Sequence, residues 1–269
     1  MAKRIQFGRS QPNKGRERRY RLELQQLNEQ MQNDMRESLI SFFRANYASD
    51  AKKPSDTDKP KTLAQLMQKM RKRWYDKYEK RGRILQRWMA NSTKELTEKE
   101  VQNKMQSIGM TLKPNYSKSD KTLVKNIVSE GVGLIKSIPQ QYIGKVQESA
   151  TAAFLRGYDS EKLYNKINDI LDDLDERNEN RAFLISRDQM QKATQKFMAQ
   201  SAMELGATKG RWIHVPGMKS SRETHQAFDG RTFDLTVGLF DEDVGLNVLP
   251  GDLPYCMCQF EVLMPGFED

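Results

Sequence analysis

The chain has 269 residues, of which 37% are hydrophobic and 30% are charged, and its mean hydropathy is −0.82. This composition is polar for a compact globule but not polar enough for general disorder, so long helices bathed in solvent are expected. There is no run of eighteen apolar residues, and polar residues follow the basic N-terminus, which argues against a transmembrane helix and against a secretory signal.

The net charge of +9 is concentrated in the N-terminal half of the chain. Residues 1–20 carry seven lysines and arginines against one glutamate, and residues 68–87 carry nine against two acidic residues. Local positive charge of this kind favours a polyanionic partner, and we expect sequence-independent contacts with double-stranded DNA. The candidate DNA-binding residues are Lys3, Arg4, Arg9, Lys14, Arg16, Arg18, Arg19, Lys69, Arg71, Lys72, Arg73, Lys77, Lys80, Arg81 and Arg83.

Residues 1–17 contain few apolar side chains and are expected to form a flexible basic arm. From Arg18 to about Tyr47, apolar residues recur at steps of three and four, which predicts an amphipathic helix. Its apolar stripe consists of Leu24, Leu27, Met31, Met35, Leu39 and Phe42. The segment DAKKPSDTDKPK, with two prolines and many charges, is predicted to be a linker.

A second helix is predicted after this linker, because Thr62 is followed three residues later by a glutamine, the spacing of a capping box. Gly82 is a weak point in the helical pattern, and Thr97 repeats the capping signal ahead of a further helix. Gly109 suits a helix C-cap. Residues 18–112 are therefore interpreted as an amphipathic and basic helical region.

Aromatic residues are interleaved with the charges of the second helix, at Trp74, Tyr75, Tyr78 and Trp88. They could stack on nucleic-acid bases or serve as the apolar stripe of the helix. Trp74 and Trp88 are fourteen residues apart, about four helical turns, and so share one face. This spacing favours a core or interface role for the aromatic residues.

The segment KPNYSKSD is interpreted as a domain boundary, and residues 120–269 as a second domain. Four successive helices are predicted in its first part, punctuated by Pro139, Gly157 and Gly206. Short strands are then predicted at 211–215, 231–237 and 258–263. The predicted fold class is mainly α with a small C-terminal α+β module and elongated N-terminal helices.

An acidic cluster at Asp172, Asp173, Asp175 and Glu176 is predicted to lie at a helix end. Paired carboxylates can hold a metal or exchange protons, but no histidine is near in the sequence. A solvated helix terminus is the favoured interpretation.

Both cysteines of the chain, Cys256 and Cys258, are one residue apart, so an extended strand would point their thiols to opposite faces. A disulfide between them is disfavoured, and reduced thiols in a cytosolic product are expected. With His225 they form an incomplete zinc set, whose fourth ligand would have to be Asp229 or Asp252. Packing with one buried thiol is favoured, and no metal or other cofactor is expected. No phosphate-binding loop, G-x-S-x-G or H-E-x-x-H motif occurs, so the chain is not expected to be an enzyme.

Two segments, SSRETHQAFDG and LPGDLPYCMC, contain the most distinctive combination of residues in the chain. Their order and spacing resemble the Mu-F-like head-morphogenesis family of tailed phages, also called minor head proteins. The matching positions are Ser186, Arg187, Asp188, Gly206, Trp212, Arg222, His225, Phe228, Asp229, Gly230, Pro250, Pro254, Cys256 and Cys258. The similarity covers roughly residues 100–269. Met257 replaces the arginine usual between the cysteines, and the acidic residue often found before the R-x-x-H element is absent.

The resemblance implies a minor head or minor capsid protein that is made in the host cytoplasm and carried into the virion, in the head interior or at the portal vertex. Its implied partners are the portal protein, other head proteins and packaged DNA, with no membrane, and its oligomeric state in the particle is left open. The implied roles are head assembly, DNA packaging or DNA ejection. Two alternatives are a nucleic-acid-binding protein outside a virion and a metal-dependent enzyme or toxin module.

The resemblance also leads to a structural hypothesis for the two segments. The segment holding His225 and the Asp229–Gly230 turn would pair with the strand holding the cysteines, which would fix the C-terminal module.

Overall fold

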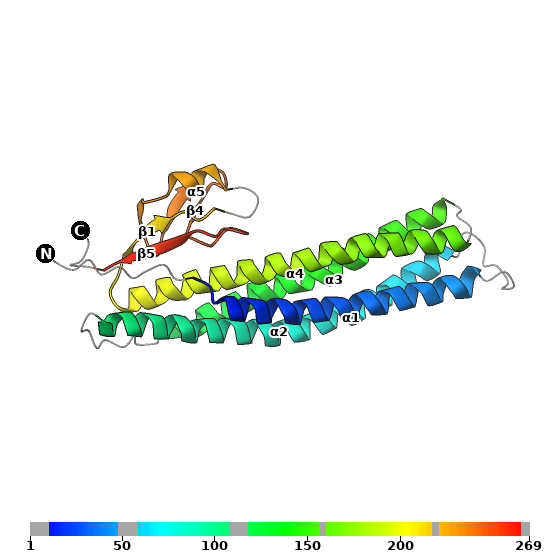
Figure 1. Cartoon of the computed structure of the whole chain (residues 1–269), viewed down its shortest axis with the longest axis horizontal. Coiled ribbons are helices and arrows are strands. Elements are labelled where there is room, and N and C mark those ends of the chain that lie inside the picture. Colours follow the sequence, from blue (N-terminus) through cyan, green and yellow to red (C-terminus); the bar gives the residue numbers. More distant parts are fainter. Residues whose placement is uncertain (1–10, 48–58, 108–117, 157–159, 217–220, 265–269) are drawn as a thin grey trace. The chain divides into compact units, whose positions relative to one another are not determined.

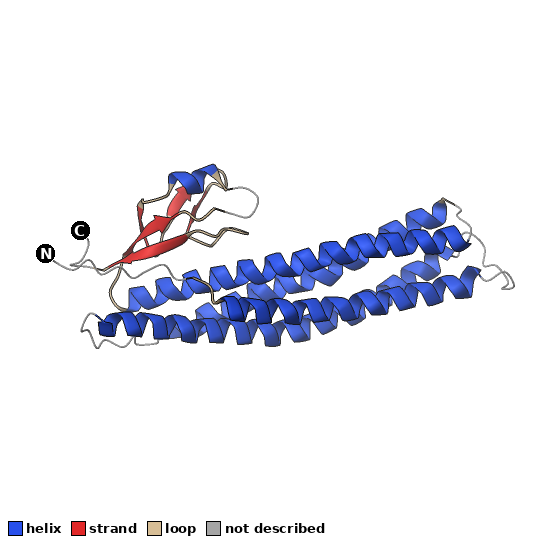
Figure 2. Ribbon diagram, in the orientation of Figure 1, coloured by secondary structure: helices blue, strands red, loops and turns tan. Residues whose placement is uncertain are grey.

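The computed structural model describes residues 11–47, 59–107, 118–156, 160–216 and 221–264, in which long helices precede a small module of short strands (Figure 1). The long helices are α1 (Lys14–Tyr47), α2 (Lys59–Ser107), α3 (Lys118–Leu155) and α4 (Ser160–Glu204). The module contains β1 (Lys209–Ile213), α5 (Glu223–Ala227), β2 (Thr232–Asp234), β3 (Leu239–Asp241), β4 (Leu246–Val248) and β5 (Gln259–Leu263). The predicted fold class, mainly α with a small C-terminal α+β module and long N-terminal helices, is confirmed (Figure 2).

The chain divides into two compact units that combine segments distant in the sequence. We call residues 20–85 and 130–185 the helical unit. We call residues up to 19, 86–129 and 186 onward the mixed unit, which contains the strands. The predicted division into 1–17, 18–112 and 120–269 follows sequence order instead. Of the predicted basic arm, residues 1–17, the first ten lie outside the described residues.

The helical unit buries the apolar stripes that the sequence predicts. Along α1, the buried side chains follow steps of three and four, as an amphipathic helix requires. They include Leu24, Leu27, Met31, Met35 and Leu39, and their counterparts on α2 are Leu63, Met67, Met70 and Trp74. Methionine fills irregular gaps between helices, which suits a core assembled from four long segments.

Polar contacts inside this core link helices that are far apart in the sequence. The buried Tyr78 hydroxyl on α2 donates to Asn28 Oδ1 on α1 at 2.7 Å. Asn28 Nδ2 in turn donates to the main-chain carbonyl of Asn178 on α4 at 3.1 Å. A buried amide with both ends satisfied fixes the relative register of these helices, because any slip would leave donors and acceptors unpaired.

The acidic cluster does not mark a helix end, so that prediction is wrong. α4 continues through it, because a cation from α1 neutralises its charge: Arg36 contacts Asp172 Oδ1 at 2.7 Å and Asp175 Oδ2 at 3.1 Å. The Tyr142 hydroxyl also donates to Asp175 at 2.7 Å. Burial raises the pKa of Asp175, and burial likewise raises the pKa of Tyr142. The cluster lies within α4 and not at its end, with Asp172, Asp173 and Glu176 exposed to solvent and Asp175 half-buried against the neighbouring helices.

Several predicted helix boundaries are also wrong. α1 begins four residues before Arg18, because Asn13 Oδ1 accepts the Arg16 amide hydrogen bond at 3.0 Å and caps the helix. Thr97 lies inside α2 and donates back to the Thr93 carbonyl, so it caps nothing. α2 also begins at Lys59, ahead of the capping box predicted at Thr62.

Glycine and proline do not break the helices where the sequence suggested. Pro139 lies within α3, although it removes one main-chain hydrogen bond there. Gly82 lies within α2, and a Cβ at this position would sit 3.1 Å from Ile135 Cγ2 on α3. The glycine therefore permits a close approach of two helices instead of interrupting one. Gly206 does follow the end of α4, with φ of 91°, whereas Gly109 and Gly157 lie outside the described residues.

The module in the mixed unit is built on β1. β1 pairs antiparallel with β2 on one side and with β5 on the other, and β3 pairs with β4 as a separate ribbon. The predicted segments 231–237 and 258–263 contain β2 and β5, and the predicted segment 211–215 overlaps β1, which begins and ends two residues earlier. The sequence analysis missed α5, β3 and β4, because these elements are short and several of their apolar residues are exposed, including Phe240 and Leu246.

Aromatic packing holds this sheet together. Trp212 on β1 is fully buried and meets the edges of Phe228 and Phe233 at centroid distances of 5.0 and 5.8 Å. At Gly210, an added Cβ would lie 3.0 Å from atoms of both Phe233 and Phe260. The absence of a side chain at Gly210 leaves room for these two rings, which come from β2 and β5, to pack over β1. Side chains from α2 and α4 complete the same core, among them Val101, Met105, Met198 and Ala202.

No helix among the described residues is long and apolar enough to cross a membrane.

We expect Asn28→Ala to lower the free energy of unfolding by about 1–3 kcal/mol, because it leaves the buried Tyr78 hydroxyl without its acceptor. Asn33→Ala is the matched control, since Asn33 lies on the same helix but is exposed and should change stability by less than about 0.5 kcal/mol. Urea unfolding followed by circular dichroism measures both. Equal shifts of the two midpoints would contradict the role given to the buried amide.

Candidate functional site

The site begins with the register of two strands. Antiparallel pairing of β1 with β5 sets Ile213 opposite Gln259. One step beyond this pair, the same register brings His214 opposite Cys258. His214 Nδ1 accordingly lies 3.6 Å from Cys258 Sγ.

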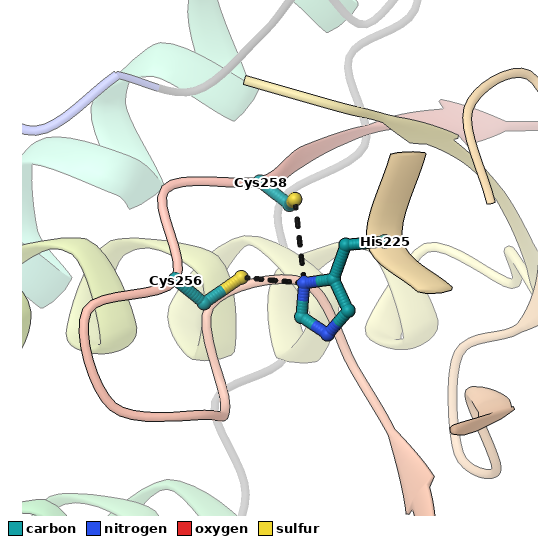
Figure 3. A group of neighbouring side chains, drawn as sticks. All are labelled: His225, Cys256 and Cys258. Atoms are coloured by element: carbon teal, nitrogen blue, oxygen red, sulfur yellow. Dashed lines mark hydrogen bonds between the residues drawn. The ribbon is translucent and has the colours of Figure 1, made fainter. Parts of the chain in front are cut away.

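His225 reaches the same place from α5 and faces both cysteines (Figure 3). Its Nδ1 lies 3.3 Å from Cys256 Sγ and 3.7 Å from Cys258 Sγ. Ligand atoms of these three residues all lie within 4.8 Å of one another. The three side chains are buried, and the two cysteines are only 4% and 2% exposed.

The prediction that the two thiols point apart, with one of them buried, is wrong. Residues 256–258 precede β5 and are not part of a strand, and Tyr255 has a φ of 60°, which turns the chain just before Cys256. Without the alternation of an extended strand, both thiols lie on the same side. The hypothesis that the cysteine segment pairs with the segment holding His225 is also wrong, because β5, which follows the cysteines, pairs with β1.

A run of polar residues on α4 holds this turn in place. Gln191 Nε2 donates to the main-chain carbonyls of Met257 at 3.2 Å and Cys258 at 2.7 Å. Asp188 Oδ1 accepts the Tyr255 amide hydrogen bond at 2.6 Å. These contacts satisfy main-chain groups that would otherwise be buried without partners, so they determine where the thiols stand.

A buried carboxylate orients His225. His225 Nε2 lies 3.1 Å from Asp241 Oδ2, and Asp241 is 0% exposed. Asp241 Oδ1 accepts the main-chain N–H of Asp243 at 3.0 Å. This contact places Nε2 of His225 against the carboxylate and turns Nδ1 toward the two sulfur atoms.

Neither aspartate proposed as a fourth zinc ligand faces the thiols. Asp229 Oδ1 accepts the main-chain N–H of His214 at 2.7 Å, so Asp229 positions that histidine instead. Asp252 accepts the Leu249 amide hydrogen bond and pairs with Lys196 at 3.3 Å. His214 occupies the place that the sequence analysis left to an aspartate.

The two thiols differ in acidity. The hydrogen bond with Cys256 lowers the pKa of Cys258 to about 7, and the main-chain N–H of Val215 acts in the same direction. The same hydrogen bond with Cys258, together with burial, raises the pKa of Cys256. Cys256 is therefore the donor of the pair, and Cys258 the sulfur that most readily carries negative charge.

Most of the other residues that carry the resemblance lie in the mixed unit with this cluster. Arg222 donates to the Pro254 carbonyl at 3.1 Å. The Gly230 amide donates to the Trp212 carbonyl at 2.9 Å, and its φ of 75° closes the turn after Asp229. Other positions of the pattern lie in the same mixed unit: Ser186, Phe228 and Pro250 are buried, and Arg187 is half-buried on α4.

The candidate DNA-binding residues differ in their surroundings. Lys3, Arg4 and Arg9 lie outside the described residues. Several others bind acidic side chains of their own chain, at Lys14–Glu17, Arg73–Asp34, Arg81–Glu23 and Arg83–Glu79. Arg71 binds Gln147, while Lys77 and Arg19 lie over the rings of Trp74 and Trp88, and Arg16 is half-buried. Arg18, Lys69, Lys72 and Lys80 are exposed.

The aromatic residues of α2 are mostly core residues, as their spacing favours. Trp74 and Tyr78 are buried, and Trp74 Nε1 donates to Asp34 at 2.6 Å. These two rings have no face free for nucleic-acid bases, so the stacking alternative is wrong for them. Tyr75 is exposed at 36%, and Trp88 is half-buried.

Comparisons with known proteins give little further guidance. No protein-family profile matches the chain, and no solved structure matches it. An uncharacterized protein of Haemophilus influenzae is 32% identical over 111 residues, which are 41% of this chain. The match spans 24% of the length of that protein, so the chain corresponds to about a quarter of it.

The cluster allows two kinds of chemistry. A thiol, an imidazole and a carboxylate in line are the parts of a nucleophilic triad. Two thiols and two imidazoles are also a full set of zinc ligands. Burial distinguishes them, since a catalytic sulfur must meet its substrate, whereas both sulfurs here are enclosed. The arrangement fits a closed site better than an active site.

Sequence reasoning missed His214, Asp241 and Gln191. One signal was available for His214, because the chain has only two histidines and two cysteines, which together make one four-ligand set. Nothing in the sequence marks Asp241 among the other acidic residues. Gln191 belongs to a buried polar group on α4 that no apolar pattern reveals.

Asp241→Asn should lower the free energy of unfolding by about 1.5–3 kcal/mol, because it breaks a buried hydrogen bond to a charged group. Asp243→Asn, a nearby substitution at an exposed position, should change it by less than about 0.5 kcal/mol. Urea titration monitored by near-ultraviolet circular dichroism reports the aromatic packing around Trp212. If both variants unfolded at the same midpoint urea concentration as the wild-type chain, Asp241 would have no orienting role.

Proposed function

We propose that this chain is a minor head protein of a tailed bacteriophage, associated with the portal and acting in head morphogenesis and DNA packaging or ejection. The proposal rests on the resemblance to the Mu-F-like family and on the way the residues that carry it fold. Non-specific contact with double-stranded DNA is part of the proposed role.

The convergence of the family pattern supports this proposal most directly. Its elements are spread over more than seventy residues of sequence, yet members of separate elements contact each other. Arg222 binds the carbonyl of Pro254, and His225 meets both Cys256 and Cys258. Matching residues scattered by chance would have no reason to meet, whereas residues of one structural module would.

The charged surface supports the DNA-binding part of the role. Lys69, Lys72 and Lys80 are exposed on α2, at spacings of three and eight residues that keep them near one another on the helix. Each could neutralise a phosphate without first giving up a described ion pair. Binding of this kind depends on charge and not on base sequence.

We expect an antibody against the chain to detect it in purified proheads and in mature particles of the phage that encodes it. A pull-down with the portal protein tests the association directly, with residues 1–100 present and deleted. Absence from both kinds of particle would refute the virion assignment and leave a nucleic-acid-binding protein outside the virion.

Replacing Lys69, Lys72 and Lys80 by glutamine should weaken binding to duplex DNA. The slope of log affinity against log salt concentration should become shallower by about 3, because each phosphate contact contributes about 0.9. A matched variant replaces the exposed Lys121, Lys125 and Lys166, which removes the same charge elsewhere. Fluorescence anisotropy from low to moderate salt gives both slopes, and identical slopes for the two variants would show that α2 is not the contact surface.

A further inference from the structure

We propose that His214, His225, Cys256 and Cys258 bind one zinc ion in a closed tetrahedral site. The ligand atoms are Nδ1 of each histidine and Sγ of each cysteine. This inference goes beyond the proposed function, because it concerns the chain itself and holds whether or not the chain enters a virion.

Three sulfur–nitrogen separations in this group match those of a tetrahedral zinc site. With Zn–S bonds of about 2.3 Å and Zn–N bonds of about 2.0–2.1 Å, a sulfur and a nitrogen on one zinc ion are about 3.6 Å apart. The three sulfur–nitrogen separations observed here are 3.3, 3.7 and 3.6 Å. An ion fits among His225, Cys256 and Cys258, whose ligand atoms all lie within 4.8 Å of one another, and the ring of His214, which lies outside that group but 3.6 Å from Cys258 Sγ, would turn toward the ion to complete the set.

The chemistry of the ligands selects zinc among the common divalent ions. Two thiolates and two imidazoles are soft or borderline ligands, which suit zinc and disfavour magnesium and calcium. Four protein ligands leave no position for water or substrate, which is the mark of a structural zinc site. Such an ion stabilises the folded module and does not catalyse a reaction.

The surroundings of the ligands support the same conclusion. A histidine that binds a metal usually donates its other ring N–H to a carboxylate, and His225 has this arrangement with the buried Asp241. Asp229 fixes the main chain of His214, and Gln191 fixes the carbonyls on either side of the second thiol. Each part of the ligand set is thus held by a neighbour that is not itself a ligand.

Packing alone accounts less well for this arrangement. One imidazole can accept a hydrogen bond from one thiol at its single unprotonated nitrogen, yet here two sulfur atoms converge on His225 Nδ1. A second imidazole then meets Cys258 from β1. A cation bound by the two thiols and His225 explains why their ligand atoms converge, with His214 beside Cys258 as the fourth ligand.

The full-length chain, purified under reducing conditions without chelators, should contain close to one zinc ion per chain by elemental analysis. Cys256→Ser, Cys258→Ser and His225→Gln should each retain less than about 0.2 equivalents after dialysis, because structural zinc sites depend on the full ligand set. His214→Gln should also lose zinc. Met257→Leu, a volume-conserving change between the two cysteines, is the matched control and should keep it.

Cobalt substitution tests the site in the wild-type chain, so the result does not depend on whether a variant folds. Co²⁺ bound by two thiolates in a tetrahedral site should give intense visible bands and a thiolate-to-cobalt charge-transfer band, and one equivalent of Zn²⁺ should abolish both. Chelation should lower the melting temperature, and Zn²⁺ but not Mg²⁺ should restore it. Asp241→Asn keeps all four ligands and should bind zinc about 10–100-fold more weakly.

Less than about 0.1 equivalents of zinc in the wild-type chain, with no charge-transfer band on adding Co²⁺, would overturn the proposal. Rapid alkylation of one native cysteine by iodoacetamide would also overturn it, and would favour a nucleophilic thiol. Since each measurement uses the purified chain, failure here leaves the virion assignment intact, and absence from particles leaves the zinc site intact.

Discussion

Antiparallel pairing of β1 with β5 determines which side chains meet at the end of the sheet, and the candidate site depends on it. The register puts His214 beside Cys258, while the ring of Phe233 packs against both Trp212 on β1 and Phe260 on β5. A shift of one residue would turn every side chain of β5 to the opposite face. The core under the sheet and the cluster at its end are therefore specified by the same pairing.

Polar groups inside the protein carry much of its specificity. In the mixed unit, Gln191 and Asp188 bind main-chain groups of the turn that holds the thiols. In the helical unit, Asn28 joins two other helices through one amide. Apolar burial supplies most of the driving force for folding, but it is non-directional, and directional bonds of this kind select one arrangement among many similar ones.

The sequence predicted the parts of the fold that depend on local pattern. The apolar stripe from Leu24 to Leu39 became core, and the strands around Trp212 and Phe260 were found, because periodicity reflects which face is buried. Helix ends were predicted poorly. Thr97 carries a signal that starts a helix and Pro139 one that interrupts a helix, yet both lie inside longer helices, because tertiary packing outweighs these local preferences.

The sequence predicted only part of the candidate site, because the rest depends on tertiary contacts. His225 and the two cysteines were recognised as one group, but their geometry was judged from an extended strand that does not exist there. The positive φ of Tyr255 and the anchoring by α4 are tertiary features with no local signature. The β1–β5 register, which supplies His214, likewise follows from long-range pairing and cannot be read from residue spacing.

Gly210 shows how ring packing constrains one strand of this module. The residue has no side chain, binds nothing and lies on β1 well before His214, yet the rings of Phe233 and Phe260 close over it. A methyl group here would lie 3.0 Å from both rings, so the rings would have to move by a few tenths of an ångström to admit it. The tolerance of this module for side chains on β1 is thus set by ring packing at a position that takes no part in any chemistry.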